Sequence, residues 1–316
     1  MRATKVFGCT LLGCLGFPVA AALVLGAIVV IDKIAEEPAD PAFEASDQVI
    51  PAGEGSSGIR AELGNVEASL SGLETPMLRA AGVLRLDVSA AELRIEPIPA
   101  GEAIRVEADY DRGGFELAKR LVEGADGWEY EVDFGPRSWL GSFSRENVDN
   151  RITIGIPENV PLRIEGRVRL AENDMELGGL HLLALDLEAG IGEHSIGFSR
   201  PTPQPVERIV VDGSIGELDL FGLGNASPLL VRVSSSVGEV HLDLDGDWRN
   251  DSEVEVDLGI GELNVDRPRT ARVESRGVRM MIGESSIGRD RAQEEDDSLP
   301  LIVLTTGSTI GEVRVE

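Results

Sequence analysis

The sequence has little cysteine, few aromatic residues and few basic side chains, and each shortage excludes a class of protein. Only Cys9 and Cys14 are present, so a disulfide scaffold is excluded. The 29 lysines and arginines face 56 acidic residues, a net charge of −27, which excludes a nucleic-acid binder that works through a basic surface. Aromatic residues are 4% of the chain and hydrophobic residues 42%, so a globular core must be mainly aliphatic.

Catalytic motifs are also missing from the sequence. There is no GxxxxGK[ST], HExxH or GxSxG motif, and no CxxC pair after Cys14. His181, His194 and His241 occur in separate segments without a matching carboxylate spacing, so we do not expect a metal site from them. We therefore predict that the protein is not an enzyme and has no catalytic residues and no cofactor.

The N-terminal part contains one long apolar run. Residues 6–31 carry no charge, and 26 residues span about 39 Å as a helix, against about 30 Å for the hydrocarbon core of a bilayer. Arg2 and Lys5 precede the run and mostly acidic residues follow it, so the positive-inside rule predicts a cytoplasmic N-terminus and a periplasmic or extracellular main domain. A cleaved signal peptide and a lipoprotein signal at Cys14 are the alternatives, and both export the same domain.

From about residue 152 the chain repeats a short motif at a nearly constant spacing. The six copies are GIGEHSI (190–196), SIGELDL (214–220), SVGEVHL (236–242), GIGELNV (259–265), MIGESSI (281–287) and TIGEVRV (309–315). Their glycines are 24, 22, 23, 22 and 28 residues apart. Aliphatic and polar residues alternate on both sides of each Gly-Glu pair, which predicts strand, corner, strand in every repeat. Glycine suits a corner that needs positive φ or close backbone approach.

A period near 23 residues in a β-rich sequence is typical of a solenoid. Two strands per repeat cannot bury their inward faces alone, but stacked coils bury them against like residues about 4.8 Å away. We therefore predict an all-β fold, a parallel β-helix (β-solenoid) of coils of about 22–24 residues with an N-terminal β cap and one preceding transmembrane helix. An antiparallel β-sandwich of hairpins is the alternative, because alternation alone does not fix strand direction.

The sequence thus divides into five segments. Residues 1–5 are the cytoplasmic N-terminus and 6–31 the transmembrane anchor. Residues 32–58 are rich in acids, proline, glycine and serine, which predicts an extended tether. Residues 59–151 contain most of the aromatic residues and are predicted to form the β cap, and 152–316 form the repeats.

Two degenerate copies are expected before the regular repeats. One lies at 86–95, with Ala91 in place of the corner glycine, and one lies within 152–187, with Asn173-Asp174 at its corner.

Three groups of residues in these segments resemble a bacterial envelope family. They are LDV (86–88) with AELRI (91–95), IPENVPL (156–162), and LGGL (177–180) followed by LDLEAGIGE (185–193). The family is the toast-rack or putative-adhesin β-strand-repeat family, similar to the C-terminal domain of LiaF-type cell-wall-antibiotic-response proteins, and the resemblance covers about residues 80–316. It implies an exported, membrane-tethered β-solenoid, in some members tied to envelope stress, and it supplies no catalytic residues. The single anchor departs from the multi-span N-terminus of LiaF-type members.

Two surfaces are candidate binding sites. The corner glutamates are expected to stack in one column, solvated or weakly associated with Ca²⁺ or Mg²⁺: Glu193, Glu217, Glu239, Glu262, Glu284 and Glu312. In the cap, Trp128, Tyr130, Arg137 and Trp139 are candidates for stacking on sugar rings or a partner, with a role in the core of the cap as the alternative. His194 falls in an inward column, where a core histidine is expected.

The C-terminal end suggests a further contact. The fifth repeat breaks the pattern at Arg276, a polar insertion (288–300) follows, and the chain ends at Glu316 inside the strand of the last copy. An uncapped terminal coil exposes unpaired backbone groups, so we expect self-association or a partner strand there.

These observations favour a membrane-anchored, non-enzymatic envelope protein that acts as a scaffold, a binding module or an envelope-stress module. The expected partners are the membrane, through the N-terminal helix, and another envelope protein or a second copy, but no nucleic acid. The alternatives are a surface adhesin and a carbohydrate-active enzyme on a β-helix, the latter resting on fold alone.

Overall fold

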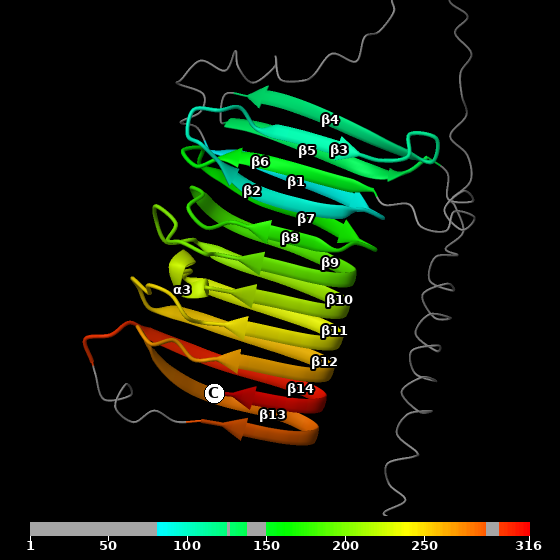
Figure 1. Ribbon diagram of the computed structural model, residues 1–316. Coiled ribbons are helices and arrows are strands. Elements are labelled where there is room, and N and C mark those ends of the chain that lie inside the picture. Colours follow the sequence, from blue (N-terminus) through cyan, green and yellow to red (C-terminus); the bar gives the residue numbers. More distant parts are fainter. Residues whose placement is uncertain (1–80, 125–126, 138–149, 289–296) are drawn as a thin grey trace, which may run out of the picture. The chain divides into compact units, whose positions relative to one another are not determined.

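The computed structural model describes residues 81–124, 127–137, 150–288 and 297–316 (Figure 1). The all-β prediction is confirmed, since the described residues form a 14-stranded mixed sheet with one short helix. The expected anchor (6–31) and tether (32–58) lie outside the described residues. No helix within the described ranges has the length and apolar character needed to span a membrane.

The described residues form fourteen strands and one short helix. In chain order they are β1 (Gly82–Ser89), β2 (Glu92–Ile98), β3 (Arg105–Asp109), β4 (Phe115–Gly124), β5 (Gly127–Pro136), β6 (Arg151–Pro157), β7 (Leu162–Arg169), β8 (Asn173–Glu176), β9 (Leu182–Gly197), β10 (Arg208–Phe221), β11 (Leu230–Asp243), β12 (Ser252–Asp266), β13 (Arg272–Ile287) and β14 (Leu301–Val315), with α3 (Leu223–Ala226) between β10 and β11.

Each of the six repeats forms one long strand that bends at its Gly-Glu pair. The strands β9 to β14 pair in parallel, and the register aligns every corner glycine with the next: Gly192, Gly216, Gly238, Gly261, Gly311 and Gly283. The residues before and after the bend form two arms, which we name arm 1 and arm 2. Because the repeats pair in parallel, the antiparallel hairpins of the alternative prediction are wrong for this part of the chain.

The earlier strands continue both arms. Strands β1 and β7 extend the arm 1 side, and β2 and β8 extend the arm 2 side, all in parallel. Beyond them, β5 pairs with β1 and β6 with β2, again in parallel, and the antiparallel strands β4 and β3 end the two sides. The degenerate copy at 86–95 is therefore β1 and β2, which meet at Ala90-Ala91 as predicted.

The corner of the second degenerate copy was misplaced. Strands β7 and β8 meet at Leu170-Ala171, whereas Asn173 and Asp174 already belong to β8. In both degenerate copies the residue before the alanine takes the left-handed conformation, with φ of +59° at Ala90 and +45° at Leu170. The prediction was misled by Asn173, a residue type that favours turns but is here buried in β8, beside His194 on β9.

The spatial order of the last two repeats is the reverse of their order in the sequence. Strand β14 lies between β12 and β13, so the edge of the sheet is β13 and not the C-terminal strand. The expectation of an uncapped coil at the C-terminus is therefore wrong. The strand with Arg276 and a break in register between Ser275 and Gly277 occupies the edge, where one side needs no partner.

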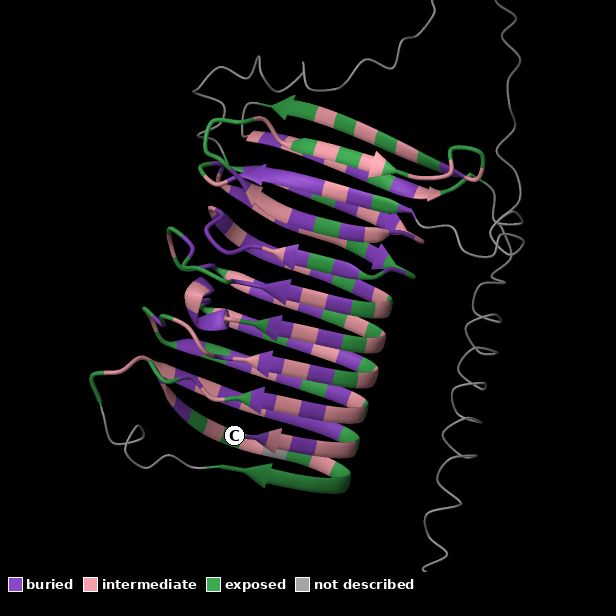
Figure 2. Cartoon of the chain, viewed as in Figure 1, coloured by how far each residue is buried: buried purple, intermediate pink, exposed green. Residues whose placement is uncertain are grey.

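The core lies between the two arms. Residues at alternate positions of each arm are buried, and those between them are partly or fully exposed (Figure 2). Buried aliphatic side chains therefore repeat at like positions from coil to coil, for example Val231, Val233, Val240 and Leu242 on β11. Their burial is the main favourable contribution to folding, about 1.5–3 kcal/mol for each side chain.

His194 is a core residue, as predicted. It is buried, and its Nδ1 lies 2.7 Å from Nδ2 of buried Asn173 on the neighbouring strand β8. Burial lowers the pKa of His194, which favours the neutral imidazole that a core position requires.

The corner glycines have two reasons to be glycine. Their φ angles lie between +136° and +150°, which side-chain-bearing residues rarely adopt. A Cβ at Gly238 would also overlap the carbonyl oxygen of Gly216 on the neighbouring strand, and one at Gly261 would overlap that of Gly238. The bends therefore stack only because no side chain stands between them.

We expect Gly238→Ala to lower the free energy of unfolding by at least about 2 kcal/mol, because it adds backbone strain to a clash with neighbouring backbone. The matched control is Gly135→Ala on β5, where a Cβ has open space and φ is not positive. Chemical denaturation of both variants measures the difference. Equal stability of the two would contradict this account of the bend.

Candidate functional site

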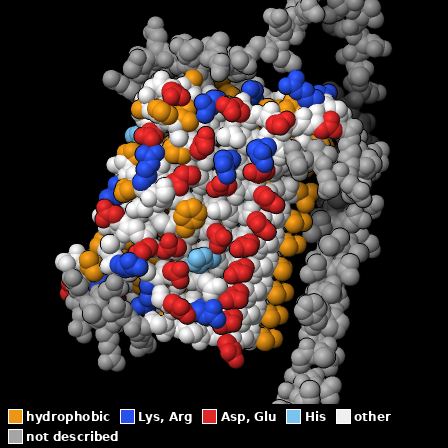
Figure 3. All heavy atoms as spheres, viewed as in Figure 1, with side chains coloured by type: hydrophobic (Ala, Val, Ile, Leu, Met, Phe, Trp, Pro, Cys, Tyr) orange, Lys and Arg blue, Asp and Glu red, His pale blue; other side chains and the backbone are white. Residues whose placement is uncertain are grey.

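The stacked bends bring two kinds of side chain to one edge of the molecule, which we name the bend edge. The residue before each corner glycine and the glutamate after it both point outward. The aliphatic column comprises Ile191, Ile215, Val237, Ile260, Ile310 and Ile282, and the carboxylate column comprises Glu193, Glu217, Glu239, Glu262, Glu312 and Glu284. Figure 3 shows a column of hydrophobic side chains beside a column of acidic ones along this edge.

The stacking of the six predicted glutamates is confirmed by the register, and their exposure follows from the bend. Strict alternation along β9 from buried Leu187 and Ala189 would turn Ile191 inward, but Ile191 is exposed. The bend interrupts the alternation, so that Ile191 and Glu193 both lie on the surface. The aliphatic column is thus an exposed surface feature rather than part of the core.

Both columns extend beyond the six repeats. Leu170 is 60% exposed at the bend before β8. Asn173 is the register partner of His194, so Glu172, one residue before Asn173, is equivalent to Glu193. On the next coil, Glu92 occupies the equivalent place, since β2 pairs with β8. The Gly-Glu pattern does not include these two glutamates, because both follow an alanine. An Ala-Glu pair directly after an aliphatic strand was the signal that could have identified them.

The carboxylate column has different electrostatics at its ends and its middle. Near one end, Arg314 lies 3.2 Å from Glu262 and 2.5 Å from Glu312. At the other end, Arg151 lies 2.7 Å from Glu92, and this hydrogen bond holds the pKa of Glu92 below its ordinary value. Both arginines neutralise carboxylates that would otherwise repel each other by about 1 kcal/mol per pair in water.

The middle of the column keeps its negative charge. The charge of Asp219, followed by burial and the charges of Glu239 and Glu193, raises the pKa of Glu217 above its ordinary value. Within the described residues, no lysine or arginine contacts Glu193, Glu217 or Glu239. In the same part of the chain, no group of three or more histidine, cysteine or acidic residues is arranged to hold a metal ion.

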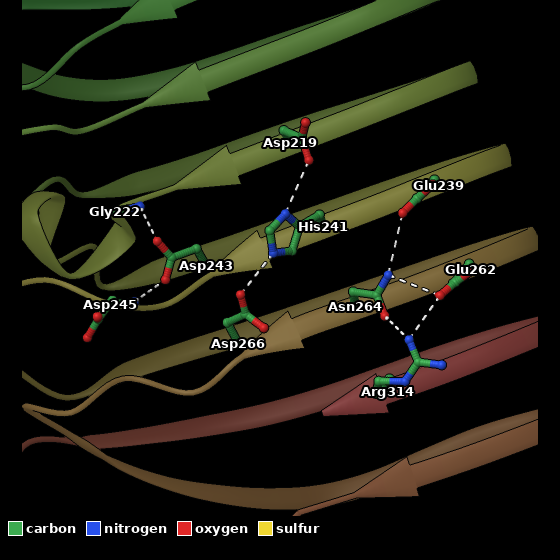
Figure 4. Close-up of polar contacts among 10 residues, drawn as sticks. All are labelled: Asp219, Gly222, Glu239, His241, Asp243, Asp245, Glu262, Asn264, Asp266 and Arg314. Atoms are coloured by element: carbon green, nitrogen blue, oxygen red, sulfur yellow. Dashed lines mark hydrogen bonds and ion pairs between the residues drawn. The ribbon is translucent and has the colours of Figure 1, made fainter. Parts of the chain in front are cut away.

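Beside the carboxylate column, polar side chains of arm 2 link neighbouring coils (Figure 4). His241 on β11 lies between two carboxylates: its Nδ1 is 3.3 Å from Asp219 and its Nε2 is 3.0 Å from Asp266. On the next strand, the Asn264 amide donates to Glu262 at 3.2 Å and to Glu239 at 3.5 Å. These side-chain contacts link neighbouring strands of arm 2 and hold the outward-facing side chains in place.

Farther along arm 2, Asp243 organises the turn that follows β11. Its carboxylate accepts hydrogen bonds from the backbone N–H of Asp245, at 2.8 Å, and of Gly222 on the neighbouring coil, at 3.4 Å. This carboxylate is therefore committed to the turn.

The predicted aromatic surface is not brought together. Trp128 and Tyr130 are 4% and 3% exposed, so they pack in the core of the cap, which was the alternative for them. Arg137 is exposed and donates to the carbonyl oxygen of Phe115 at 3.0 Å, and Trp139 lies outside the described residues. Gly82 makes room for the Trp128 ring, since a Cβ there would overlap it.

The pH dependence of stability should report the His241 contact. Partial burial lowers the pKa of His241, but the hydrogen bond to Asp266 and the charges of Asp266 and Asp219 raise it to a net value above the ordinary one. The stabilisation is therefore fully present below about pH 6.5 and is lost as the pH rises through the folded-state pKa. We expect His241→Gln to cost about 0.5 kcal/mol more near pH 6 than above about pH 8, a small value because the side chain is partly exposed.

Denaturant titrations at both pH values measure this effect. The control is the same substitution in an Asp266→Asn background, where the difference between the two pH values should shrink. A cost that is independent of pH in the original background would contradict the assignment.

Comparison with known proteins found solved structures to which this chain is similar. No protein-family model and no curated protein matches the chain. A putative cell adhesion protein from Clostridium sporogenes is 16% identical, with a TM-score of 0.39, over 75% of this chain and 92% of that one. A putative adhesin from Bacteroides fragilis is 12% identical, with a TM-score of 0.31, over 74% and 91%. The names of both structures agree with the resemblance of the sequence to the putative-adhesin β-strand-repeat family.

Proposed function

We propose that the chain is an exported, non-enzymatic binding module that acts as a surface adhesin, with its bent parallel strands wound as a β-solenoid. The observation that carries the proposal is the bend edge, where aliphatic and carboxylate side chains, exposed or half-buried, form two outward-facing columns at the strand spacing of about 4.8 Å. Contiguous exposed apolar surface of this kind marks an interaction site in soluble domains.

The two columns define the chemistry of the ligand. A partner that pairs with this edge offers apolar groups to the aliphatic column and cationic groups to the unneutralised carboxylates at Glu193, Glu217 and Glu239. Each exposed ion pair contributes little, about 0.2–1 kcal/mol, but a row of them at constant spacing adds up on an extended ligand. An elongated surface built from repeats is therefore suited to a polymer or to a repetitive surface.

The location is part of the proposal. The uncharged run at residues 6–31 would anchor the chain, and the acidic, proline-containing segment at 32–58 would hold the module away from the membrane. In this arrangement the bend edge faces the outside or the periplasm, where an adhesin or an envelope-stress module meets its ligand.

Membrane placement can be tested in cells that express the full chain. Protease added outside the cytoplasmic membrane of intact spheroplasts should digest the module, and deletion of residues 6–31 should leave the module protected inside. Lysed spheroplasts are the control for digestibility. A full chain that resists protease until lysis would contradict an exported module.

Ligand binding can be tested with peptides of alternating lysine and valine, with alternating lysine and serine as the equally charged comparison. The full chain, kept in mild detergent, should bind the Lys-Val peptide more tightly, because only valine contacts the aliphatic column. The triple variant Glu193→Gln, Glu217→Gln, Glu239→Gln should weaken binding about tenfold at low ionic strength.

The matched control removes the same charge elsewhere. Glu102, Glu123 and Glu253 are exposed carboxylates outside the carboxylate column, and their joint replacement by glutamine should leave affinity nearly unchanged. Equal losses in the two triple variants would show that only net charge matters, and would overturn the assignment of the bend edge as the binding surface.

A further inference from the structure

The edge strand β13 presents an unpaired backbone. It pairs only with β14 among the described residues, and its other side faces away from the sheet (Figure 1). A long edge strand with free N–H and C=O groups is a template for another strand unless the protein blunts it. The two arms of β13 differ in this respect.

Arm 1 of β13 has features that hinder pairing with another strand, whereas residues 278–287 do not. The register with β14 shifts between Ser275 and Gly277, and Arg276 lies at this irregularity, which are two of the devices that protect sheet edges. From residue 278 to residue 287 the pairing with β14 is regular, apart from the bend that every repeat shares. Ten consecutive residues centred on the bend are therefore available for pairing.

Most of the same segment is exposed (Figure 2), and some of its exposed residues are apolar. Met281 is 80% and Ile282 63% exposed, which are the largest exposures among the hydrophobic residues of the described chain. Ile287 is also exposed, although its register partner Val315 on β14 is fully buried. A further strand would bury Ile287 as β13 buries Val315, and would reduce the exposure of Ile282 toward the 39% of its register partner Ile310.

The charges of this segment are opposite on the two sides of the bend. Arg279 precedes the bend and Glu284 follows it, both are exposed, and within the described residues neither forms an ion pair. A two-fold axis through the bend reverses the direction of the strand, so that arm 1 of one copy meets arm 2 of the other. The segment is then complementary to itself in charge, as an isologous interface requires.

We propose that residues 278–287 of β13 pair in antiparallel fashion with the same residues of a second copy, giving a two-fold symmetric dimer. Centring the axis between Ile282 and Gly283 sets Met281 opposite Glu284 of the second copy and Arg279 opposite Ser286. Arg279 is then diagonal to Glu284 of the second copy, within reach of a long side chain. The pairing adds about ten backbone hydrogen bonds. The two-fold axis makes the contact between Arg279 and Glu284 occur twice in the dimer.

The test is a charge exchange in the full chain, kept in mild detergent because of its apolar residues 6–31. Sedimentation velocity or light scattering over a range of concentrations should show a dimer. Arg279→Glu and Glu284→Arg should each weaken it about tenfold or more, because like charges then face each other. The double variant, which restores opposite charges, should recover the dimer.

Two controls separate this contact from general effects. Glu102→Arg reverses an exposed carboxylate between β2 and β3, outside the carboxylate column and far from β13, and should leave the dimer unchanged, and circular dichroism should show the same strand content in every variant. Amide hydrogen exchange at residues 278–287 should slow as concentration rises. A monomer at all concentrations, a dimer that survives both single reversals, or single losses that the double variant does not restore would each overturn the proposal.

Discussion

The contact between the backbones of successive bends is the constraint on which the rest of the structure depends. At each Gly-Glu corner the carbonyl oxygen of the neighbouring corner residue, a glycine or Ala171, lies where the glycine would carry its Cβ, so the strands approach as closely as backbone allows. This contact admits no slip, because a shift of one residue would bring a side chain into the gap. The register of both arms is therefore set at the bend and carried outward along the strands.

A fixed register converts a short sequence repeat into columns of like side chains. Such columns stabilise the fold where the side chains are apolar and buried, and destabilise it where they carry like charges. Inside, like aliphatic residues stack on one another, and their burial stabilises the paired strands. Outside, the same rule stacks like charges. The sequence offsets this repulsion at both ends, through Arg151 at Glu92 and Arg314 at Glu262 and Glu312, and leaves the middle negative. Beside the aliphatic column, Glu193, Glu217 and Glu239 form no ion pair among the described residues, and neither does Glu284 on the edge strand β13.

Much of this arrangement could be predicted from the sequence, because the bend residues are spaced evenly and identical in type. The Gly-Glu pairs gave the parallel columns and the inward position of His194. Leu170 and Glu172 were missed because the left-handed residue there is a leucine, which no pattern of glycines indicates. The burial of Trp128 depends on Gly82, which lies far away in the sequence and makes room for the ring. Such long-range complementarity has no local signal.

The order of the last two repeats shows how the pattern within a strand selects its place in the stack. In an interior position, β13 would have to pair along both of its edges in spite of the register break at Gly277. It would also place the polar Ser285 between aliphatic residues of the column that contains Val313 and Leu263. Strand β14 is not ideal either, since the hydroxyl groups of Thr306 and Ser308 are buried and have no hydrogen-bond partner in the described part of the chain. However, β14 keeps an unbroken register, and Val313 and Val315 continue the core. The most irregular repeat therefore takes the edge position, in which irregularity costs least.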